Sequence, residues 1–498
     1  MDNRFNLIDE DWIPVADHGR VSLGKLFSNA HYRSLGGNPV QKIAIFKLLL
    51  AIAQAAATPK DDGEWLALGA EGLAQRCLAY LQKWHSRFYL YGESPFLQIP
   101  AIAAARVQQF GAVMAEVSTG NTTVLNQGQV ERELDEADRA VLLLTLMGFA
   151  LSGKKTDNSV VLTAGYAGKR NSKGKASTGK PGPSVAHMGL LHTFLIGKSL
   201  QQSVWLNLLT QQQVGQMKIY SAGVGIAPWE KMPAGEDCLV ARTLRDSLIG
   251  RLLPLSRFCL LTDDGMHYSE GIAHAGYKDG MVDPSMAVNY SGTDPKALWV
   301  DPEKRPWRAL TALLGFIQQS EGHSFQCWQV RCSLDRARDQ VKLFALWSGG
   351  LRVSSNAGEQ YVSGTDDFVE SEIWLHSDML GQSWFTHLKH EMDALEDLAR
   401  NLYGRVMGYY KELTVDGGKW APQATNLFWQ LCERNFQQLV DHCDQSGPAK
   451  AERRKLRRRF SGYAHQAYNL SCPRDTARQL SAWAKQKPNN SIYLRQEI

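Results

Sequence analysis

The sequence predicts an α+β protein, in which a large mixed α/β N-terminal domain over residues 1–375 is followed by a four-helix bundle over residues 380–498. Up to about residue 375, helical patterns are interspersed with short strand-like runs and turn sequences, which is typical of a domain containing both kinds of element. After residue 383, apolar residues recur every three or four positions, as in amphipathic helices. Such helices, joined by short connections, pack as an antiparallel bundle.

Composition indicates a globular protein with no membrane segment. The chain has 498 residues, of which 44% are hydrophobic and 21% charged, as is usual for globular proteins. The net charge is only +5, so any nucleic-acid surface must be a local patch. The first residues lack the features of a signal peptide, and the longest apolar run, residues 43–57, is interrupted by Lys47 and Gln54. We therefore expect a cytoplasmic protein without a membrane partner.

The elements of the first 150 residues follow from apolar spacing and turn chemistry. Residues 12–15 predict a short strand closed by a proline. Apolar residues on most sides of residues 40–57 predict a buried helix. Asp62 is the expected N-cap of a helix over residues 65–84, and residues 138–151 predict a further apolar helix.

A polar loop over residues 118–129 carries two apolar residues, Val124 and Leu125, among small and amide side chains. The pair either packs back onto its own domain or anchors the protein to a partner.

Residues 153–189 form a glycine-rich basic segment. It has seven Lys or Arg against one acid. Glycines such as Gly165 and Gly168 break helical patterns and allow backbone N–H groups to approach a ligand. A cationic loop of this kind suits a phosphate backbone, although it is equally compatible with a solvated surface loop. The candidate contact residues are Gly165, Gly168, Lys169, Arg170, Lys173 and Lys175.

The same segment contains an imperfect nucleotide-binding motif. The residues from Gly174 to Lys180 fit the first seven positions of a P-loop. The eighth is Pro181, where a Ser or Thr hydroxyl must hold magnesium. Proline also disfavours the α conformation at Lys180, where the P-loop helix should begin.

The second half of the first domain mixes strands and helices. Residues 190–209 are core-like, residues 306–319 predict a helix, and residues 325–333 and 341–347 predict strands. Residues 349–358 form a second polar tip flanked by glycines, with Ser354, Ser355, Asn356 and Ala357 at its centre.

The third bundle helix, predicted over residues 449–470, begins very basic. A charge run of this kind is usually a solvated face, but guanidinium groups also fit phosphates well. The candidate basic face consists of Arg453, Arg454, Arg457 and Arg458.

Candidate catalytic and metal-binding residues are few. His387 and His390 lie one turn apart, but their order matches no zinc motif, and the spacing of His187 and His192 suits neither a helix face nor a strand face. Eight cysteines are scattered without a C-x-x-C pair, so neither a zinc nor a disulfide framework follows. We expect no catalytic residue, no metal and no cofactor.

Several short motifs occur in one order along the whole chain. They are Asn6-Leu7-Ile8-Asp9-Glu10-Asp11-Trp12-Ile13-Pro14-Val15, Lys60-Asp61-Asp62, Phe88-Tyr89-Leu90, Pro95-Phe96-Leu97-Gln98, Asn126-Gln127-Gly128, Asp283-Pro284-Ser285-Met286-Ala287 and Trp307-Arg308-Ala309-Leu310. Together with the C-terminal bundle, they resemble the CasA family, the large subunits of the type I-E CRISPR surveillance complex Cascade. The first motif is the most specific.

The resemblance implies a non-catalytic subunit of an RNA-guided antiviral complex. Its implied partners are the 5′ handle of the guide RNA, target double-stranded DNA, the backbone and small subunits, and a helicase-nuclease. Val124, Leu125 and Asn126 match the loop that docks on the handle and on neighbouring subunits.

The resemblance also implies that the glycine-rich segment and the second tip read the protospacer-adjacent motif (PAM) from the minor groove and wedge the duplex open. A·T and T·A pairs look alike in that groove, so several motifs would be tolerated. A serine or Asn356 stands where some family members have a wedge glutamine. A general nucleic-acid-binding scaffold and a nucleotide-dependent enzyme using the imperfect P-loop remain the alternatives.

Overall fold

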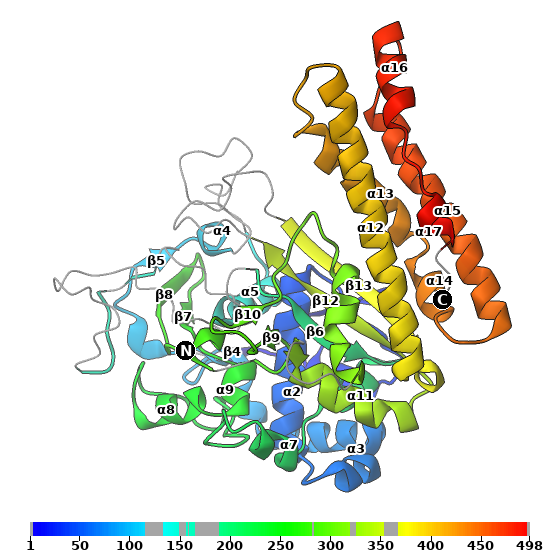
Figure 1. Cartoon of the computed structure of the whole chain (residues 1–498). Coiled ribbons are helices and arrows are strands. Elements are labelled where there is room, and N and C mark those ends of the chain that lie inside the picture. Colours follow the sequence, from blue (N-terminus) through cyan, green and yellow to red (C-terminus); the bar gives the residue numbers. More distant parts are fainter. Residues whose placement is uncertain are drawn as a thin grey trace. The chain divides into compact units, whose positions relative to one another are not determined.

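The computed structural model describes residues 3–114, 133–148, 156–157, 159–164, 189–280, 283–318, 325–352 and 367–495. Helices and strands are both well represented, which confirms the predicted α+β class (Figure 1). The protein divides into two compact units. The first comprises Met1–Pro306, Gly322–Gln340 and Phe344–Glu372, and the second comprises Trp307–Glu321, Val341–Leu343 and Ile373–Ile498.

The strands are short and pair antiparallel in small sheets, with orders β1-β4, β2-β3, β5-β8-β7, β10-β9-β11 and β13-β12-β6. They are β1 (Arg4–Asn6), β2 (Ile13–Val15), β3 (Gly19–Val21), β4 (Tyr89–Tyr91), β5 (Val107–Gln108), β6 (His192–Ile196), β7 (Arg257–Leu261), β8 (Met266–Glu270), β9 (Ala287–Asn289), β10 (Lys296–Ala297), β11 (Gln326–Cys327), β12 (Leu343–Arg352) and β13 (Asp367–His376). The predicted strand over residues 12–15 is confirmed as β2.

The helices of the first unit connect and cover these strands. They are α1 (Leu23–Ser28), α2 (Pro39–Ala57), α3 (Asp62–Lys83), α4 (Phe110–Val113), α5 (Glu136–Gly148), α6 (Leu200–Asn207), α7 (Gln211–Gln216), α8 (Leu239–Arg245), α9 (Leu248–Leu252) and α11 (Trp328–Gln340), with short 3-10 turns η1 (His85–Arg87), η2 (Pro100–Ile102) and η3 (Tyr277–Asp279).

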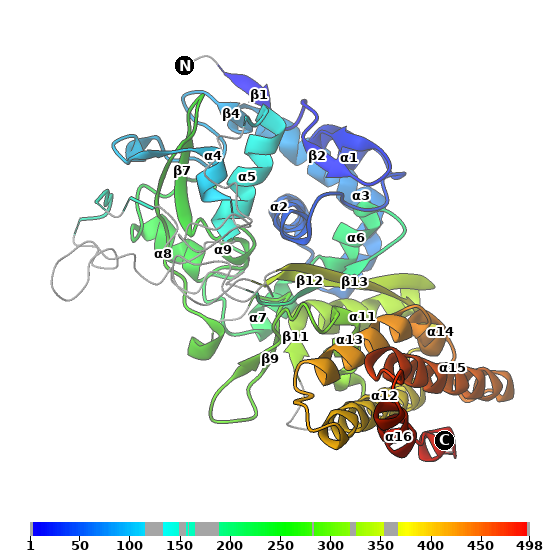
Figure 2. The ribbon, with the colours of Figure 1, turned by 90° about the horizontal axis from the view of Figure 1, so that it is seen from above.

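Helix α2 is the centre of the first unit. Its start is fixed by a capping box: the Asn38 side chain accepts from the Gln41 N–H at 3.0 Å, and the Gln41 side chain accepts from the Asn38 N–H at 3.0 Å. Figure 2 looks down α2, which lies between α5 on one side and α3 and α6 on the other. Residues on every side of α2 are buried, as the sequence predicted.

Helix α2 is also the one helix of the described residues that is long and apolar enough to cross a membrane. Within the protein, 72% of its apolar window is buried, and its lysine, Lys47, is paired with Asp283. Both features are those of a core helix.

Helices α3 and α6 are joined by two tryptophans. The Trp65 and Trp205 rings stack at 4.0 Å, and each indole N–H donates to the backbone oxygen of the other residue. The predicted helix after residue 62 is present but begins earlier: Asp61, not Asp62, is its N-cap and accepts from the Glu64 N–H at 2.9 Å.

Two sequence predictions in the middle of the protein are wrong. The strand expected over residues 325–333 ends at Cys327, and α11 follows from Trp328. Its buried Val330, Leu334 and Ala337 have helical spacing, which overrides the local alternation of apolar and polar residues. The helix expected over residues 306–319 is broken into η4 (Pro306–Ala309), α10 (Leu310–Leu313) and η5 (Gly315–Gln318).

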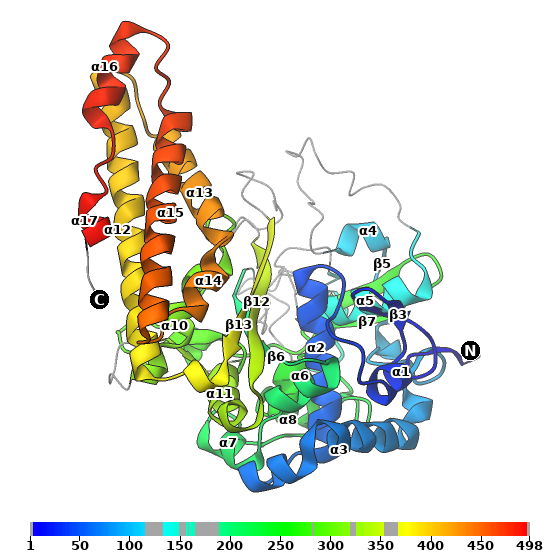
Figure 3. The ribbon, with the colours of Figure 1, turned by 90° about the vertical axis from the view of Figure 1, so that its right-hand side faces the viewer.

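The second unit is mainly helical, as predicted for the C-terminal region (Figure 3). Helices α12 (Gln382–Glu412) and α15 (Gly447–Ser471) run side by side, and both pack against α13 (Trp420–Glu433). Asn435 leaves the helical conformation and separates α13 from α14 (Phe436–Asp441). The unit is completed by α16 (Ala477–Gln486) and α17 (Ser491–Arg495), and a 3-10 turn, η6 (Ser377–Met379), precedes α12.

Candidate nucleic-acid interface

Three of the four sequence-predicted contact regions lie outside the described residues, as does the imperfect P-loop from Gly174 to Pro181. What the structure does describe is the framework from which these segments start and to which they return. The predicted residues concerned are Val124, Leu125, Asn126, Gly165, Gly168, Lys169, Arg170, Lys173, Lys175, Ser354, Ser355, Asn356 and Ala357.

The basic segment and the second tip are anchored on neighbouring strands of one sheet. The basic segment ends at Gly189, just before β6. The tip was predicted to start at Gly349, but residues 349–352 are the last residues of β12, so the part of the tip beyond the strand starts after Arg352. β6 and β12 pair antiparallel, with Gly349 opposite His192. Gly189 has a φ of +94°, and a Cβ there would lie 3.3 Å from the Leu351 carbonyl oxygen. The structure therefore brings these two ends into contact.

The N-terminal part of the basic segment is fixed by a buried carboxylate. Glu236 is fully buried and accepts hydrogen bonds from the backbone N–H groups of Leu162 and Thr163, at 3.1 and 2.8 Å to its Oε2. The Asp237 N–H donates to the Thr163 hydroxyl at 3.1 Å. The segment is thus held by the first unit at Leu162 and Thr163, in its N-terminal part, and at its last residue, Gly189.

A buried charged cluster lies directly behind β6. Asp283 is paired with Lys47 of α2, and it also accepts from the Ser285 hydroxyl at 2.6 Å and the Ser285 N–H at 2.9 Å. The Ser285 hydroxyl lies 2.8 Å from His192 Nδ1. Burial opposes ionisation of Asp283, but the Lys47 ammonium, His192 and the Ser285 hydrogen bond together outweigh it and hold the pKa of Asp283 below its usual value. The cluster ties α2, β6 and the Asp283 turn together.

Two histidines of this unit are held neutral by burial. Burial lowers the pKa of His192 to about 3, and the nearby Lys47 charge acts in the same direction. Burial likewise lowers the pKa of His274 to about 3, with Arg251 contributing. His192 is therefore a core residue.

We expect the first unit to lose stability as the pH falls below about 6.5, where unfolded histidines take up protons. The folded imidazoles stay neutral down to a pKa of about 3, so the unfolded state binds more protons in this range. The loss should approach about 1.4 kcal/mol per pH unit for each histidine. Urea denaturation between about pH 7 and pH 5 measures this slope.

The matched variants are His274→Gln and His31→Gln. Glutamine can still donate to the Pro254 carbonyl oxygen, which lies 2.6 Å from His274 Nε2, but it does not titrate. His274→Gln should therefore flatten the slope, and the same change at exposed His31 should not. An unchanged slope in His274→Gln would contradict the assignment.

The predicted basic face of α15 needs correction. Arg453 and Arg457 are 3% and 4% exposed and point into the second unit, because both pair with the buried Glu391 of α12. Arg457 Nε donates to Glu391 Oε2 at 2.9 Å, and Arg453 Nε lies 3.8 Å from Glu391 Oε1. Only Arg454 and Arg458 of the four predicted residues are exposed.

No group of three or more His, Cys, Asp or Glu among the described residues is arranged to hold a metal ion. His387 Nδ1 donates to the Ser383 carbonyl oxygen at 2.8 Å, within the first turns of α12. His390 Nδ1 faces the Arg457 guanidinium at 3.4 Å. The two histidines thus have different hydrogen-bond partners within the second unit.

Sequence reasoning missed the partners of the buried charges. The position of Lys47 inside an apolar run could have indicated that it needs a buried acidic partner. The Asp283-Pro284-Ser285-Met286-Ala287 motif could have indicated the turn that supplies this partner. Glu236 and Glu391 had no comparable signal, because their partners are more than 60 positions away along the sequence.

Comparison with known proteins gives consistent matches along the sequence. The family model for the CRISPR-associated protein Cse1 matches residues 6–467. The curated CRISPR-associated protein CasA/Cse1 of Thermus thermophilus is 32% identical over 164 residues, which are 30% of this chain and 32% of that protein. The aligned part therefore spans about a third of that relative.

Solved structures show the same fold over nearly the whole length. CasA of Thermus thermophilus has a TM-score of 0.73 at 19% identity, covering 99% of both proteins. Thermobifida fusca Cse1 has a TM-score of 0.74 at 18% identity, covering 99% of this chain and 98% of the other. One subunit in the structure of a CRISPR RNA-guided surveillance complex has a TM-score of 0.69 at 17% identity, covering 99% and 100%.

The shared fold and the family match define a CRISPR-associated protein. Because the family model covers most of its length, the chain belongs to the Cse1 family, whose Thermus thermophilus member is also named CasA. The resemblance to CasA seen in the short sequence motifs is confirmed.

Proposed function

We propose that this protein is the large, non-catalytic subunit of an RNA-guided DNA surveillance complex in cytoplasmic antiviral defence. In this role it recognises the PAM in double-stranded DNA, helps to open the duplex and recruits a helicase-nuclease. The observation that carries the proposal is the Cse1 family match over residues 6–467. The similarity in fold to part of a surveillance complex supports membership of an assembly.

The anchoring of the two DNA-contacting segments supports PAM reading and wedging by one composite surface. The basic segment returns to the sheet at Gly189, beside Leu351 at the end of β12, from which the second tip departs. Segments that start at adjacent points can reach the same few base pairs of a duplex. Lysines of the basic segment would bind phosphates. The small residues of the second tip would contact the minor groove and separate the two DNA strands.

Guide RNA and neighbouring subunits are the proposed partners of the polar loop. Val124 and Leu125 supply apolar area for a subunit contact, and Asn126 supplies an amide for the 5′ handle of the guide. Of the four predicted arginines of α15, the exposed Arg454 and Arg458 are the proposed contacts of the displaced DNA strand, since Arg453 and Arg457 are paired inside the second unit.

The experiment is replacement of Lys169, Arg170, Lys173 and Lys175 by alanine in the reconstituted complex. We expect weaker binding to target duplex, and a salt dependence whose slope falls by up to about one unit per lost phosphate contact. Binding titrations at several salt concentrations measure both quantities.

A control variant carries the same charge change at four exposed cations outside the segment: Arg76, Lys83, Arg87 and Lys231. It should bind DNA like the unmodified protein. If the variant in the basic segment keeps both affinity and slope, this segment is only a solvated surface loop.

A further inference from the structure

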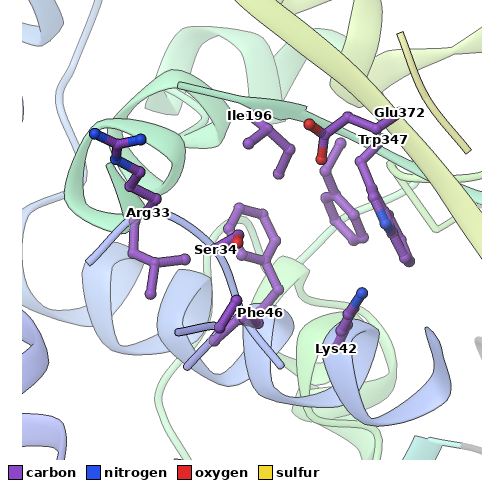
Figure 4. Close-up of a pocket in the computed structure, with 11 residues that line it drawn as sticks. Arg33, Ser34, Lys42, Phe46, Ile196, Trp347 and Glu372 are labelled. Carbon is purple, nitrogen blue, oxygen red and sulfur yellow. The ribbon is translucent and has the colours of Figure 1, made fainter. Parts of the chain in front are cut away.

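A cavity of about 160 Å³ opens in the first unit between α2, β6 and β12. Figure 4 shows Phe46, Ile196 and Trp347 around an open space, with Arg33, Lys42 and Glu372 at its edge. Phe46 and Lys42 come from α2, Ile196 from β6, Trp347 from β12 and Glu372 from β13. The walls are therefore built from elements far apart in the sequence.

The aromatic wall is fixed before any ligand arrives. The Phe46 and Phe194 rings meet edge to face at 4.8 Å, and Phe194 and Trp347 stack at 6.3 Å. The Trp347 indole N–H donates to Glu370 Oε2 at 2.9 Å, and Lys42 Nζ binds both oxygens of the same carboxylate, at 3.0 and 2.8 Å. A pocket held in this way is largely preformed, which is usual for binding sites.

The volume corresponds to one aromatic ring. Protein interiors normally leave few voids larger than a water molecule. An apolar cavity of about 150 Å³ is known to stay dry and to accept a benzene molecule. The cavity lined by Phe46, Phe194 and Trp347 has about this volume, at 160 Å³.

The chemistry of the lining favours a side chain over a nucleobase. A nucleobase would bury several ring-edge donors and acceptors against Phe46, Phe194 and Ile196, where they would lack partners. The charges around the mouth also balance, because Lys42 is paired with Glu370 and Glu372 lies among the lining residues with Arg33, so the mouth offers no net positive charge to a phosphate backbone. A phenyl ring buries only apolar edges, and an indole ring adds a single N–H donor. The backbone carbonyl and N–H groups that flank it would face cations (Arg33, Lys42) and a carboxylate (Glu372) respectively.

We propose that this cavity receives an aromatic side chain presented by a neighbouring protein subunit. The proposal rests on the proposed function, which places the protein in a multi-subunit complex. Protein contacts are commonly anchored by such residues in preformed pockets, where a few aromatic side chains supply most of the binding energy.

The first test fills the cavity without removing a wall. Ala16 and Ser34 line it and are half-buried, so Ala16→Leu and Ser34→Leu each place a side chain into the space. Either variant should keep or raise the melting temperature and bind the remaining subunits at least about tenfold more weakly. The control is Ala55→Leu, at a half-buried alanine of α2 that does not line the cavity, and it should assemble normally.

The second test uses small probes on the isolated protein, read by saturation transfer in ligand-observed NMR. Indole should bind the unmodified protein and not Ala16→Leu. Adenine binding in place of indole, or no indole binding at all, would overturn the proposal. So would normal assembly of both filled variants. If the unmodified protein itself fails to assemble, the proposed function is what fails, and the cavity proposal falls with it.

Discussion

Replacing Asp283 with alanine is expected to lower the free energy of unfolding by about 3–5 kcal/mol, because it leaves the Lys47 ammonium buried without its partner. Lys47 and Asp283 side chains are 6% and 1% exposed, so water cannot replace the lost charge. The change also removes the acceptor of the Ser285 hydroxyl and N–H. Urea denaturation of the purified protein measures the effect.

Two companion variants separate charge from packing. Lys47→Met combined with Asp283→Ala removes both charges and should recover part of the loss. Asp294→Ala breaks an exposed pair with Lys278, in which the Lys278 and Asp294 side chains are 60% and 72% exposed, and should change stability little. An Asp283→Ala variant as stable as Asp294→Ala would show that the buried pair does not hold α2 to β6.

Replacing Glu391 with alanine is expected to destabilise the second unit by a similar amount, about 3–5 kcal/mol. The substitution leaves two guanidinium groups, those of Arg453 and Arg457, buried without the carboxylate that they share. Arg457 also contacts the Tyr493 carbonyl oxygen at 3.5 Å, which carries no full charge to replace the carboxylate. Urea denaturation of the purified protein, followed by circular dichroism, measures the loss.

The matched control is Glu452→Ala, which removes an exposed carboxylate of α15 paired with Lys455 at 2.6 Å. It should leave the unfolding curve nearly unchanged. If Glu391→Ala behaves like Glu452→Ala, then Arg453 and Arg457 are able to turn outward, and the predicted basic face of four arginines would be restored.

The sequence was most informative where one strong pattern dominated. The apolar run of α2 and the helical spacing of α12 determined their structure, because burial on most sides or on one long face is encoded locally. The strand predicted over residues 325–333 was wrong for the converse reason. Their alternating pattern indicated a strand, while Val330, Leu334 and Ala337 pack as one helical face in the folded protein.

The candidate interface was predictable in outline only. Composition and the family resemblance predicted the basic segment and the second tip as contact regions. That the two lie next to each other could not be predicted, because it depends on β6 and β12 pairing across about 150 residues of sequence, with Gly349 opposite His192. The orientation of α15 was partly readable, since Arg453 and Arg457 share the spacing of buried Leu456 and Phe460. Their partner Glu391 lies on another helix, which no local pattern reveals.

The most direct test of the account is the dissociation constant for target duplex of the guide-loaded complex, reconstituted with and without this protein. We expect its omission to weaken binding by at least about tenfold, the scale of a few lost phosphate contacts. The preference for duplexes that carry the PAM should vanish at the same time. Equal affinity and equal preference in both reconstitutions would contradict a role in recognising target DNA.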